Sequence, residues 1–301
     1  PDHPHGYVTS LRAKRSITWE VDLPCEQRGR YRLGPVEAHM SDPLGLFPVH
    51  RELGTASSVL VLPRWVPLKR SILKLDGFMT GEARGRRRTE SPPTVVSVRE
   101  YSAGDSIAAI HWMASARTGQ LMTKQFDSLV QTTLWLALDL DGALPPDIEE
   151  LMVTAACSLG VFSLRRANLR VGLVASGAVT VSLPAERGKA QQYHFQEVLA
   201  EVHPGAQGVL SDQLARLDRS LGPGQVITLL TARRPDVWGA WLERMARRGV
   251  AARVIHIVPD DDPNPRALWP VPTATLHASL ADPARQYELI AALEGRVAKG
   301  G

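Results

Sequence analysis

Two carboxylates separated by one residue are the clearest candidates for chemistry in this sequence. Asp139 and Asp141 stand at the end of a nearly continuous apolar run over residues 132–140, which is typical of a buried parallel strand. In α/β proteins, ligands bind beyond the carboxyl ends of such strands. Hard cations prefer oxygen ligands, and Mg2+ takes about six of them in an octahedron. The pair therefore indicates either a Mg2+ site or a carboxylate-based reaction centre.

A second dense group of polar residues lies between positions 99 and 117. An imidazole is the commonest acid/base group near neutral pH, and Glu100 or Asp105 could orient His111. The sequence places no clear nucleophile beside it, and an interior histidine satisfied by a carboxylate would give the same pattern. We therefore interpret this group as structural rather than catalytic.

The local pattern around this second group predicts a strand, a turn, a helix and a return strand. Asp105 is placed to cap the helix by accepting hydrogen bonds from its first N–H groups. Gly119 is placed to end it, and residues 121–126 read as the return strand. The apolar face of the predicted helix is formed by Ile107, Ile110 and Ala114.

The residues after this segment alternate between strands and helices, which predicts a doubly wound α/β domain. Strands are expected at 132–140, 170–175, 179–183, 225–230 and 253–258, and helices at 147–167, 190–202, 212–221, 237–248 and 283–293. The strands at 170–175 and 179–183 read as a hairpin, which would add an antiparallel edge strand to the sheet.

The first part of the chain predicts a β-sandwich-like domain, because short strands are separated by turns rich in Gly and Pro. A stretch without apolar residues over 85–93, including three consecutive arginines, cannot be buried and is interpreted as a linker. These arginines could also contact anionic lipid. The expected domains are 1–80 (β-rich), 81–94 (linker), 95–127 (a strand–turn–helix joint) and 128–296 (α/β).

Composition limits the classes of function. The 301 residues are 44% apolar and carry a net charge of +4, so sizeable cores can form and no nucleic-acid partner is expected. Cys25 and Cys157 give neither a disulfide framework nor metal-ligand spacing. No apolar run reaches the ~20 residues needed to span a bilayer. Because the chain begins without Met, we expect a soluble fragment of a longer protein.

Several short motifs together resemble the bacterial "domain of unknown function 58" family. They are Arg99-Glu100-Tyr101, Gly104-Asp105, Ile110-His111-Trp112, Ala116-Arg117, Gln125-Phe126 and, upstream, Gly29-Arg30-Tyr31, Gly34-Pro35 and Asp42 to Phe47. The resemblance covers most of the chain from Arg28 onward. It implies transmembrane helices before the β domain, a von Willebrand factor A-like (Rossmann-like) domain after it, and association with a MoxR-type AAA+ ATPase. The chain departs from the family at Ala108, Ala109 and Met113, where basic residues are usual.

The resemblance also bears on the two carboxylates. In von Willebrand factor A domains this position carries Asp-x-Ser-x-Ser, which binds a divalent cation. Asp139 matches the motif, Asp141 replaces the first Ser, and Ala143 has lost the second oxygen ligand. We therefore expect a degenerate site without a bound cation, weak Mg2+ binding being the alternative.

The same residues resemble the nucleophile motif of haloacid dehalogenase-type phosphatases. Asp139 would attack phosphorus, Asp141 would act as acid/base, and Thr231 and the acidic run at 260–262 would supply later motifs. That chemistry needs a Lys to steady the phosphoryl charge, and the sequence has none between Thr231 and Asp260. The arginines present there are poor substitutes for a point charge. A Mg-dependent phosphatase is thus the alternative function.

The sequence as a whole predicts a non-catalytic partner-binding or scaffold module of a protein anchored in the bacterial cell membrane by segments absent from this chain. The residues at 95–127 are predicted to join the two domains. In that joint Trp112 would be buried, and Arg99 or Arg117 would pair with Glu100 or Asp105, since buried charges persist only when paired.

Overall fold

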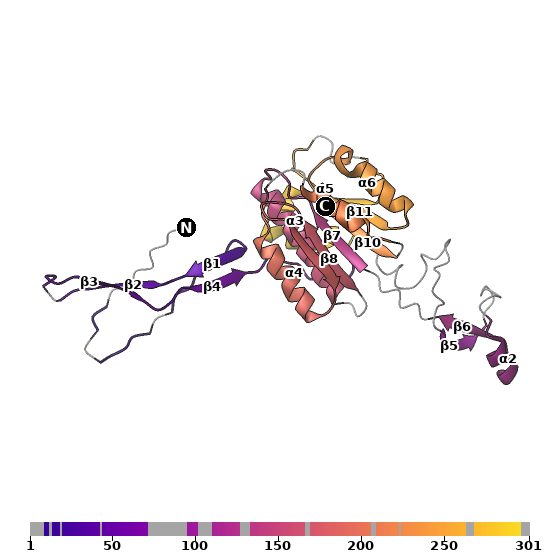
Figure 1. Ribbon diagram of the computed structural model, residues 1–301, viewed down its shortest axis with the longest axis horizontal. Helices are drawn as coiled ribbons and strands as arrows, with labels where there is room; N and C mark the ends of the chain where they lie inside the picture. Colours follow the sequence, from indigo (N-terminus) through magenta and orange to yellow (C-terminus); the bar gives the residue numbers. More distant parts are fainter. Residues whose placement is uncertain are drawn as a thin grey trace. The chain divides into compact units, whose positions relative to one another are not determined.

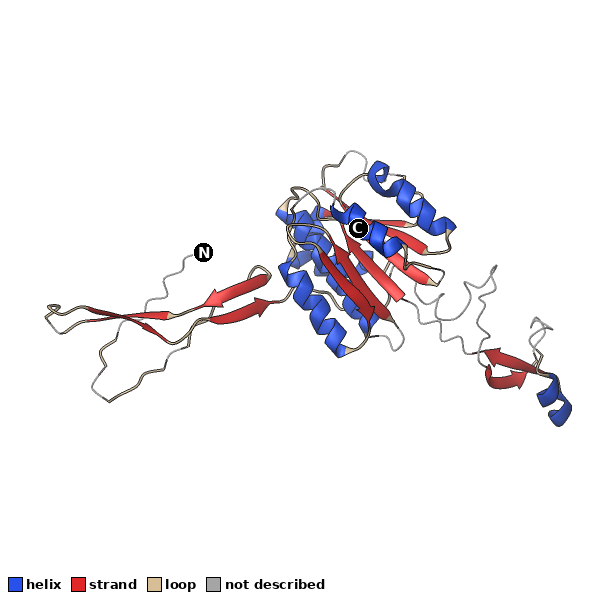
Figure 2. Ribbon diagram, in the orientation of Figure 1, coloured by secondary structure: helices blue, strands red, loops and turns tan. Residues whose placement is uncertain are grey.

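The computed structural model describes residues 9–11, 14–18, 20–42, 44–71, 95–101, 110–126, 133–165, 169–205, 209–222, 224–262 and 268–295. The chain divides into two compact units, Pro1–Leu62 and Pro63–Gly301 (Figures 1 and 2). Each unit is described by itself below.

The N-terminal unit is built from short antiparallel strands, as predicted. Strand β1 (Gly29–Leu33) pairs with β4 (Ser57–Val61), and β2 (Val36–Met40) pairs with β3 (Val49–Leu53). The described strands pair two by two and form two small antiparallel sheets.

The second unit contains a six-stranded sheet in the order β12-β11-β10-β7-β8-β9. Its strands are β7 (Thr133–Leu138), β8 (Arg170–Ala175), β9 (Val181–Glu186), β10 (Gln225–Thr231), β11 (Ala251–Val258) and β12 (Thr273–His277). All neighbouring pairs are parallel except β8 and β9. The hairpin expected from the sequence therefore does supply an antiparallel edge strand.

Helices cover both faces of this sheet (Figure 2). They are α3 (Pro146–Leu164), α4 (Lys189–Glu201), α5 (Val209–Asp218), α6 (Pro235–Arg247) and α7 (Gln286–Leu293), with short 3-10 turns at η3 (Ala278–Ala281) and η4 (Pro283–Arg285). Side chains of β7 alternate between the faces. Leu134, Leu136 and Leu138 join the core under α3, α4 and α7, whereas Ala137 joins the core under α5 and α6.

Helix α3 is buried along almost its whole length. A methyl group added at Gly160 would lie 2.3 Å from the ring of Phe195 on α4, so the missing side chain lets the two helices approach closely. Cys157 on the same helix is a buried free thiol and Cys25 an exposed one. Burial raises the pKa of Cys157 to about 12, which keeps this thiol in its unreactive protonated form.

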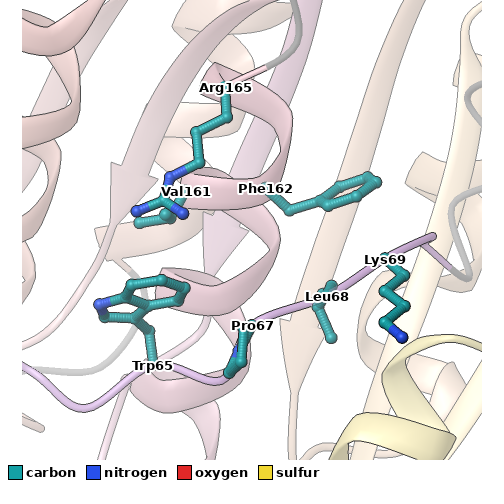
Figure 3. A pocket seen from close by; sticks show the side chains of 7 residues that line it. All are labelled: Trp65, Pro67, Leu68, Lys69, Val161, Phe162 and Arg165. Atoms are coloured by element: carbon teal, nitrogen blue, oxygen red, sulfur yellow. The ribbon is translucent and has the colours of Figure 1, made fainter.

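The segment that follows the N-terminal unit packs on α3. Val66 is fully buried in the core, and its N–H donates to Ser158 Oγ at 2.9 Å. The guanidinium of Arg165 lies over the ring of Trp65, 4.7 Å from its centroid (Figure 3). The boundary between the two compact units falls between Leu62 and Pro63.

The predicted return strand is present. Strand β5 (Val95–Glu100) pairs antiparallel with β6 (Met122–Phe126), and α2 (Trp112–Thr118) lies between them in sequence. Gly119 ends α2 in the left-handed conformation, with φ 71°, as predicted.

The beginning of this helix differs from the prediction. Ile110 forms a β-bridge to Thr123, so it does not lie on a helix. The N-cap is His111, whose Nδ1 accepts a hydrogen bond from the N–H of Ala114 at 3.1 Å. Asp105, the expected cap, lies outside the described residues.

None of the helices in the described part of the chain is long and apolar enough to cross a membrane.

Candidate functional site

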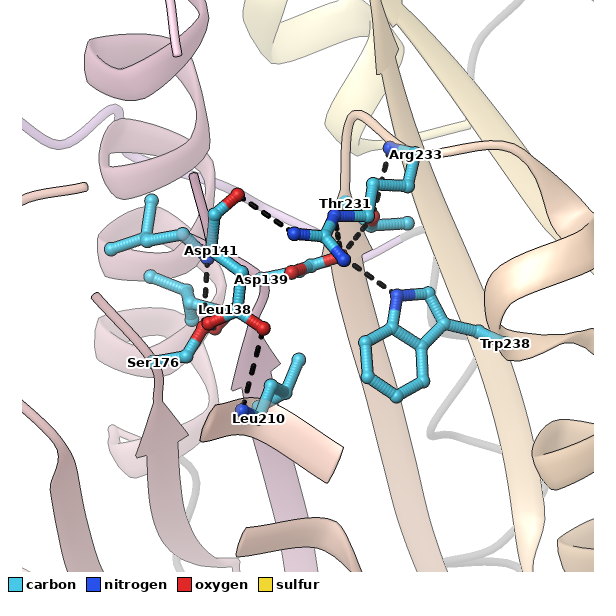
Figure 4. Close-up of polar contacts among 9 residues, drawn as sticks. Leu138, Asp139, Asp141, Ser176, Leu210, Thr231, Arg233 and Trp238 are labelled. Carbon is cyan, nitrogen blue, oxygen red and sulfur yellow. Dashed lines mark hydrogen bonds and ion pairs between the residues drawn. The ribbon is translucent and has the colours of Figure 1, made fainter. Parts of the chain in front are cut away.

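Asp139 sits at the carboxyl end of β7, where three side chains converge on its carboxylate (Figure 4). Its Oδ2 accepts hydrogen bonds from Thr231 Oγ1 and Trp238 Nε1, both at 2.7 Å. Arg233 Nε lies 3.6 Å from the same oxygen. The Asp139 side chain has no solvent-exposed area, while that of Arg233 is 30% exposed. Arg233 therefore lies between the buried carboxylate of Asp139 and the solvent, and it closes this polar cluster on its exposed side.

Sheet register explains why these residues meet. Leu138 pairs with Leu230 on the adjacent parallel strand β10, so Asp139 and Thr231 leave neighbouring strand ends side by side. The N–H of Asp139 also donates to the carbonyl of Leu230 at 2.9 Å. Trp238 comes from the buried face of α6, which begins at Pro235, a favoured first helical residue because Pro lacks an N–H.

Asp141 is tied into the same cluster through its backbone. Arg233 Nη2 donates to the carbonyl oxygen of Asp141 at 2.9 Å, so one guanidinium spans both aspartates (Figure 4). The Asp141 side chain points toward the start of α5, where its Oδ2 lies 3.5 Å from the N–H of Leu210. Gly205 forms a parallel bridge with Asp141 and fixes this loop from the other side.

Burial dominates the electrostatics of the cluster. It raises the pKa of Asp139 above its ordinary value of 3.8, while the bonds from Thr231 and Trp238 and the charge of Arg233 act in the opposite direction. The negative charge of Asp141 adds a smaller upward contribution. Asp139 Oδ1 is buried and has no hydrogen-bond partner among the described residues. The guanidinium therefore provides the positive charge closest to a carboxylate that is costly to bury.

The residues of this cluster do not fit a divalent cation. Position 143 offers only an alanine, and the charge next to Asp139 is already supplied by Arg233. A second cation beside the guanidinium would meet like-charge repulsion in a poorly solvated place. Within the described ranges, no group of three or more His, Cys, Asp or Glu side chains is arranged to hold a metal ion.

The signature residues at 99–117 are placed differently from the two aspartates. His111 is a partly buried helix cap, and the N–H of Tyr101 donates to the carbonyl of Leu121 at 2.8 Å. Trp112 is 65% exposed, so its predicted burial is not what the structure shows. The remaining residues are Glu100 and Arg117, which are exposed, Arg99, whose backbone lies in β5, and Gly104 and Asp105, which lie outside the described residues.

The sequence did not lead us to expect that three residues of this cluster contact Asp139. Thr231 and Arg233 were considered only for a phosphatase, and Trp238 was not singled out. Ser176 was missed as well; its Oγ accepts a hydrogen bond from the N–H of Leu140 at 3.1 Å. A usable signal existed, because β7, β8 and β10 each end in or are followed by a buried polar residue.

The sheet order and its antiparallel edge define the class of this unit. When the six strands of this sheet are numbered in chain order, they run 3-2-1-4-5-6, a doubly wound order. The third strand is antiparallel, and an aspartate follows the first. These features define a von Willebrand factor A-like α/β domain.

The chain belongs to the family described as "Protein of unknown function DUF58", whose model matches residues 97–258. It is 24% identical over 274 residues to the uncharacterized protein YeaD of Bacillus subtilis, covering 81% of this chain and 67% of that protein. It is also 24% identical over 197 residues to the uncharacterized protein Rv1480 of Mycobacterium tuberculosis, covering 62% of each.

A solved structure of an aerotolerance-related membrane protein from Bacteroides fragilis matches with 15% identity and a TM-score of 0.29. That match covers 42% of this chain and 67% of the other.

Proposed function

We propose that this chain is a non-catalytic partner-binding module of a membrane-anchored bacterial protein, and that a MoxR-type AAA+ ATPase is its partner. The observation that carries this proposal is the closed state of the Asp139 cluster. The carboxylate of Asp139, which could have served a metal or a reaction, is held by the protein's own Arg233, Thr231 and Trp238, and Arg233 also binds the backbone carbonyl of Asp141. The resemblance to family members with transmembrane helices and an ATPase partner supports the rest.

The alternative function, a phosphatase, needs a nucleophilic carboxylate that can reach phosphorus. Asp139 has no exposed side-chain area, and its Oδ2 already accepts two hydrogen bonds. The late acidic run is engaged elsewhere. Asp262 lies 3.8 Å from Arg234, and Asp260 Oδ1 accepts from the N–H of Ser279 at 3.3 Å. These contacts argue against the phosphatase assignment.

We place the partner surface on the carboxyl edge of the sheet, where the loops after β7 and β10 meet. Ligands of open α/β sheets commonly occupy this edge. The loop after β10 presents Arg233, 30% exposed, and Arg234, 60% exposed. Two adjacent arginines suit an interface, because arginine is enriched in interface cores and donates to several acceptors at once.

The proposal is tested by co-purification of the full-length protein with the MoxR-type ATPase of the same bacterium. Arg234→Glu should weaken retention of the ATPase by at least about tenfold, the size expected for reversing a charge in an interface. Arg247→Glu is the matched control, because Arg247 is 74% exposed on the last turn of α6. Recovery of no ATPase with the wild-type protein, or equal losses in the two variants, would contradict the proposal.

A further inference from the structure

A pair of histidines faces each other across the N-terminal ribbon. His39 on β2 is directly opposite His50 on β3. Directly opposed residues have Cβ atoms only about 4.5–5.5 Å apart, so their side chains share one face. The two Nδ1 atoms are in contact, and the rings are nearly perpendicular, with centroids 4.5 Å apart and an interplanar angle of 80°. Both imidazoles are solvent-exposed.

The same face carries a second opposed pair, Glu37 and Glu52, because side chains two residues apart in a strand point the same way. Glu37 Oε2 lies 3.7 Å from Nε2 of His39. Arg51 pairs with Ala38 and therefore belongs to the opposite face. The histidine face thus combines two imidazole nitrogens with two carboxylates, while the arginine of β3 lies on the other side.

We propose that His39 and His50 form a chelating site for a divalent transition-metal ion such as Zn2+. The two Nδ1 atoms face each other across the ribbon, so both nitrogens are on the side where a shared cation would bind. Metal–nitrogen bonds of about 2.0–2.1 Å would place two tetrahedral ligand nitrogens roughly 3.3 Å apart. Both rings are solvent-exposed, and the proposal requires them to rotate apart to that separation. Imidazole is a preferred ligand of Zn2+, Cu2+ and Ni2+.

Glu37 acts in this site as a positioning residue. A histidine that binds a metal through one ring nitrogen commonly donates its other N–H to a carboxylate, which fixes the ring and raises its basicity. The 3.7 Å between Glu37 Oε2 and His39 Nε2 places the carboxylate beside the nitrogen that does not face the metal. Glu52, opposite Glu37, adds negative charge to the face that receives the cation.

The site is tested by titrating the metal-stripped chain with Zn2+ at neutral pH and measuring the heat of binding by isothermal titration calorimetry. The wild-type chain should bind Zn2+ saturably, and His39→Ala or His50→Ala should each lower the affinity by at least about tenfold. Glu37→Gln should weaken binding by roughly 10–100-fold, the effect typical of removing an outer-shell carboxylate. His194→Ala is the matched control, because His194 is exposed on α4 in the other unit, and its affinity should be unchanged.

A second measurement locates the ion independently of any substitution. Added Ni2+ should broaden backbone amide signals of residues 37–40 and 49–52 before others in the NMR spectrum. His3 and His5 are a second pair of closely spaced histidines that could bind the ion, and they lie outside the described residues. A His3→Ala/His5→Ala variant is therefore included, and it should keep the wild-type affinity for Zn2+. The site is refuted by a wild-type chain that does not bind Zn2+, by unchanged affinity in His39→Ala, or by broadening centred elsewhere.

Discussion

Arg233→Met removes the guanidinium from the Asp139 cluster while keeping most of the apolar stem. At 3.6 Å and an effective dielectric constant of about 20, the ion pair with Asp139 corresponds to about 4–5 kcal/mol of Coulomb energy. Its charged hydrogen bond to the Asp141 carbonyl contributes about 1.5–3 kcal/mol. Because Arg233 is 30% exposed, water replaces part of both, and removing the desolvated arginine recovers some energy. We expect a net destabilisation of about 2–4 kcal/mol.

For a unit of this size, that loss lowers Tm by roughly 5–15 °C. Circular dichroism melts and urea titrations of the two proteins measure it. Arg234→Met is the matched control, because the side chain of Arg234 is 60% exposed. The stability of this variant should differ from that of the wild type by less than about 0.5 kcal/mol. Equal melting of Arg233→Met and wild type would refute the view that the guanidinium holds this edge together.

The stability difference between wild type and Arg233→Met should depend on pH through the ionisation of Asp139. The folded-state pKa of Asp139 is raised above 3.8, so ionisation of this group lowers stability as pH rises from 3.8 through the raised value. Loss of Arg233 raises that pKa further, and the difference between the proteins should therefore grow from acid to neutral pH. Urea titrations across this range measure it. A difference that is constant with pH would show that the charge of Asp139 is not involved.

The remaining predictions concern the metal, the alternative chemistry and the packing. Mg2+, Mn2+ and EDTA should leave the Tm of the α/β unit unchanged, whereas a rise with Mg2+ would contradict the account of Arg233. The chain should release no phosphate from an aryl phosphate with any common divalent metal; turnover that Asp139→Asn abolishes would establish the phosphatase. Gly160→Ala should lower the free energy of unfolding by about 1–3 kcal/mol through overpacking against Phe195, as measured by urea titration. Adding Phe195→Leu to this variant should recover part of the lost stability. Ser158→Ala should cost about 1 kcal/mol by removing the acceptor for the Val66 N–H, and an unchanged urea midpoint would argue against that bond.

The architecture of the α/β unit was largely accessible from sequence. Periodicity and length set apart the buried run at 132–140, and the closely spaced strands over 170–183 gave the antiparallel edge. Gly119 was recognisable as a helix end because a left-handed residue is needed there. These features depend on neighbours a few residues apart, which a sequence displays directly.

The candidate site was predictable only in part. Asp139 was found because it follows an apolar run, but its contacts with Thr231 and Trp238 join positions 92 and 99 residues apart. They depend on which strands are neighbours, and that information is not local. The start of α2 was misplaced for a different reason. His111 caps α2 with a ring nitrogen, whereas Ser, Thr, Asp and Asn are the commoner caps, so sequence pattern alone does not point to it.

The seating of Val66 in the core has a mechanical consequence. A pull transmitted along the chain from the N-terminal side reaches the α/β unit first at residues 64–66, where Arg64 donates to the carbonyl of Ala281 at 3.2 Å. Val66 is anchored to α3 by burial and by the bond to Ser158. Such a pull would peel a short segment from a helix before it reached any strand of the central sheet. Under tension, this contact would therefore break first, while the central sheet remains folded.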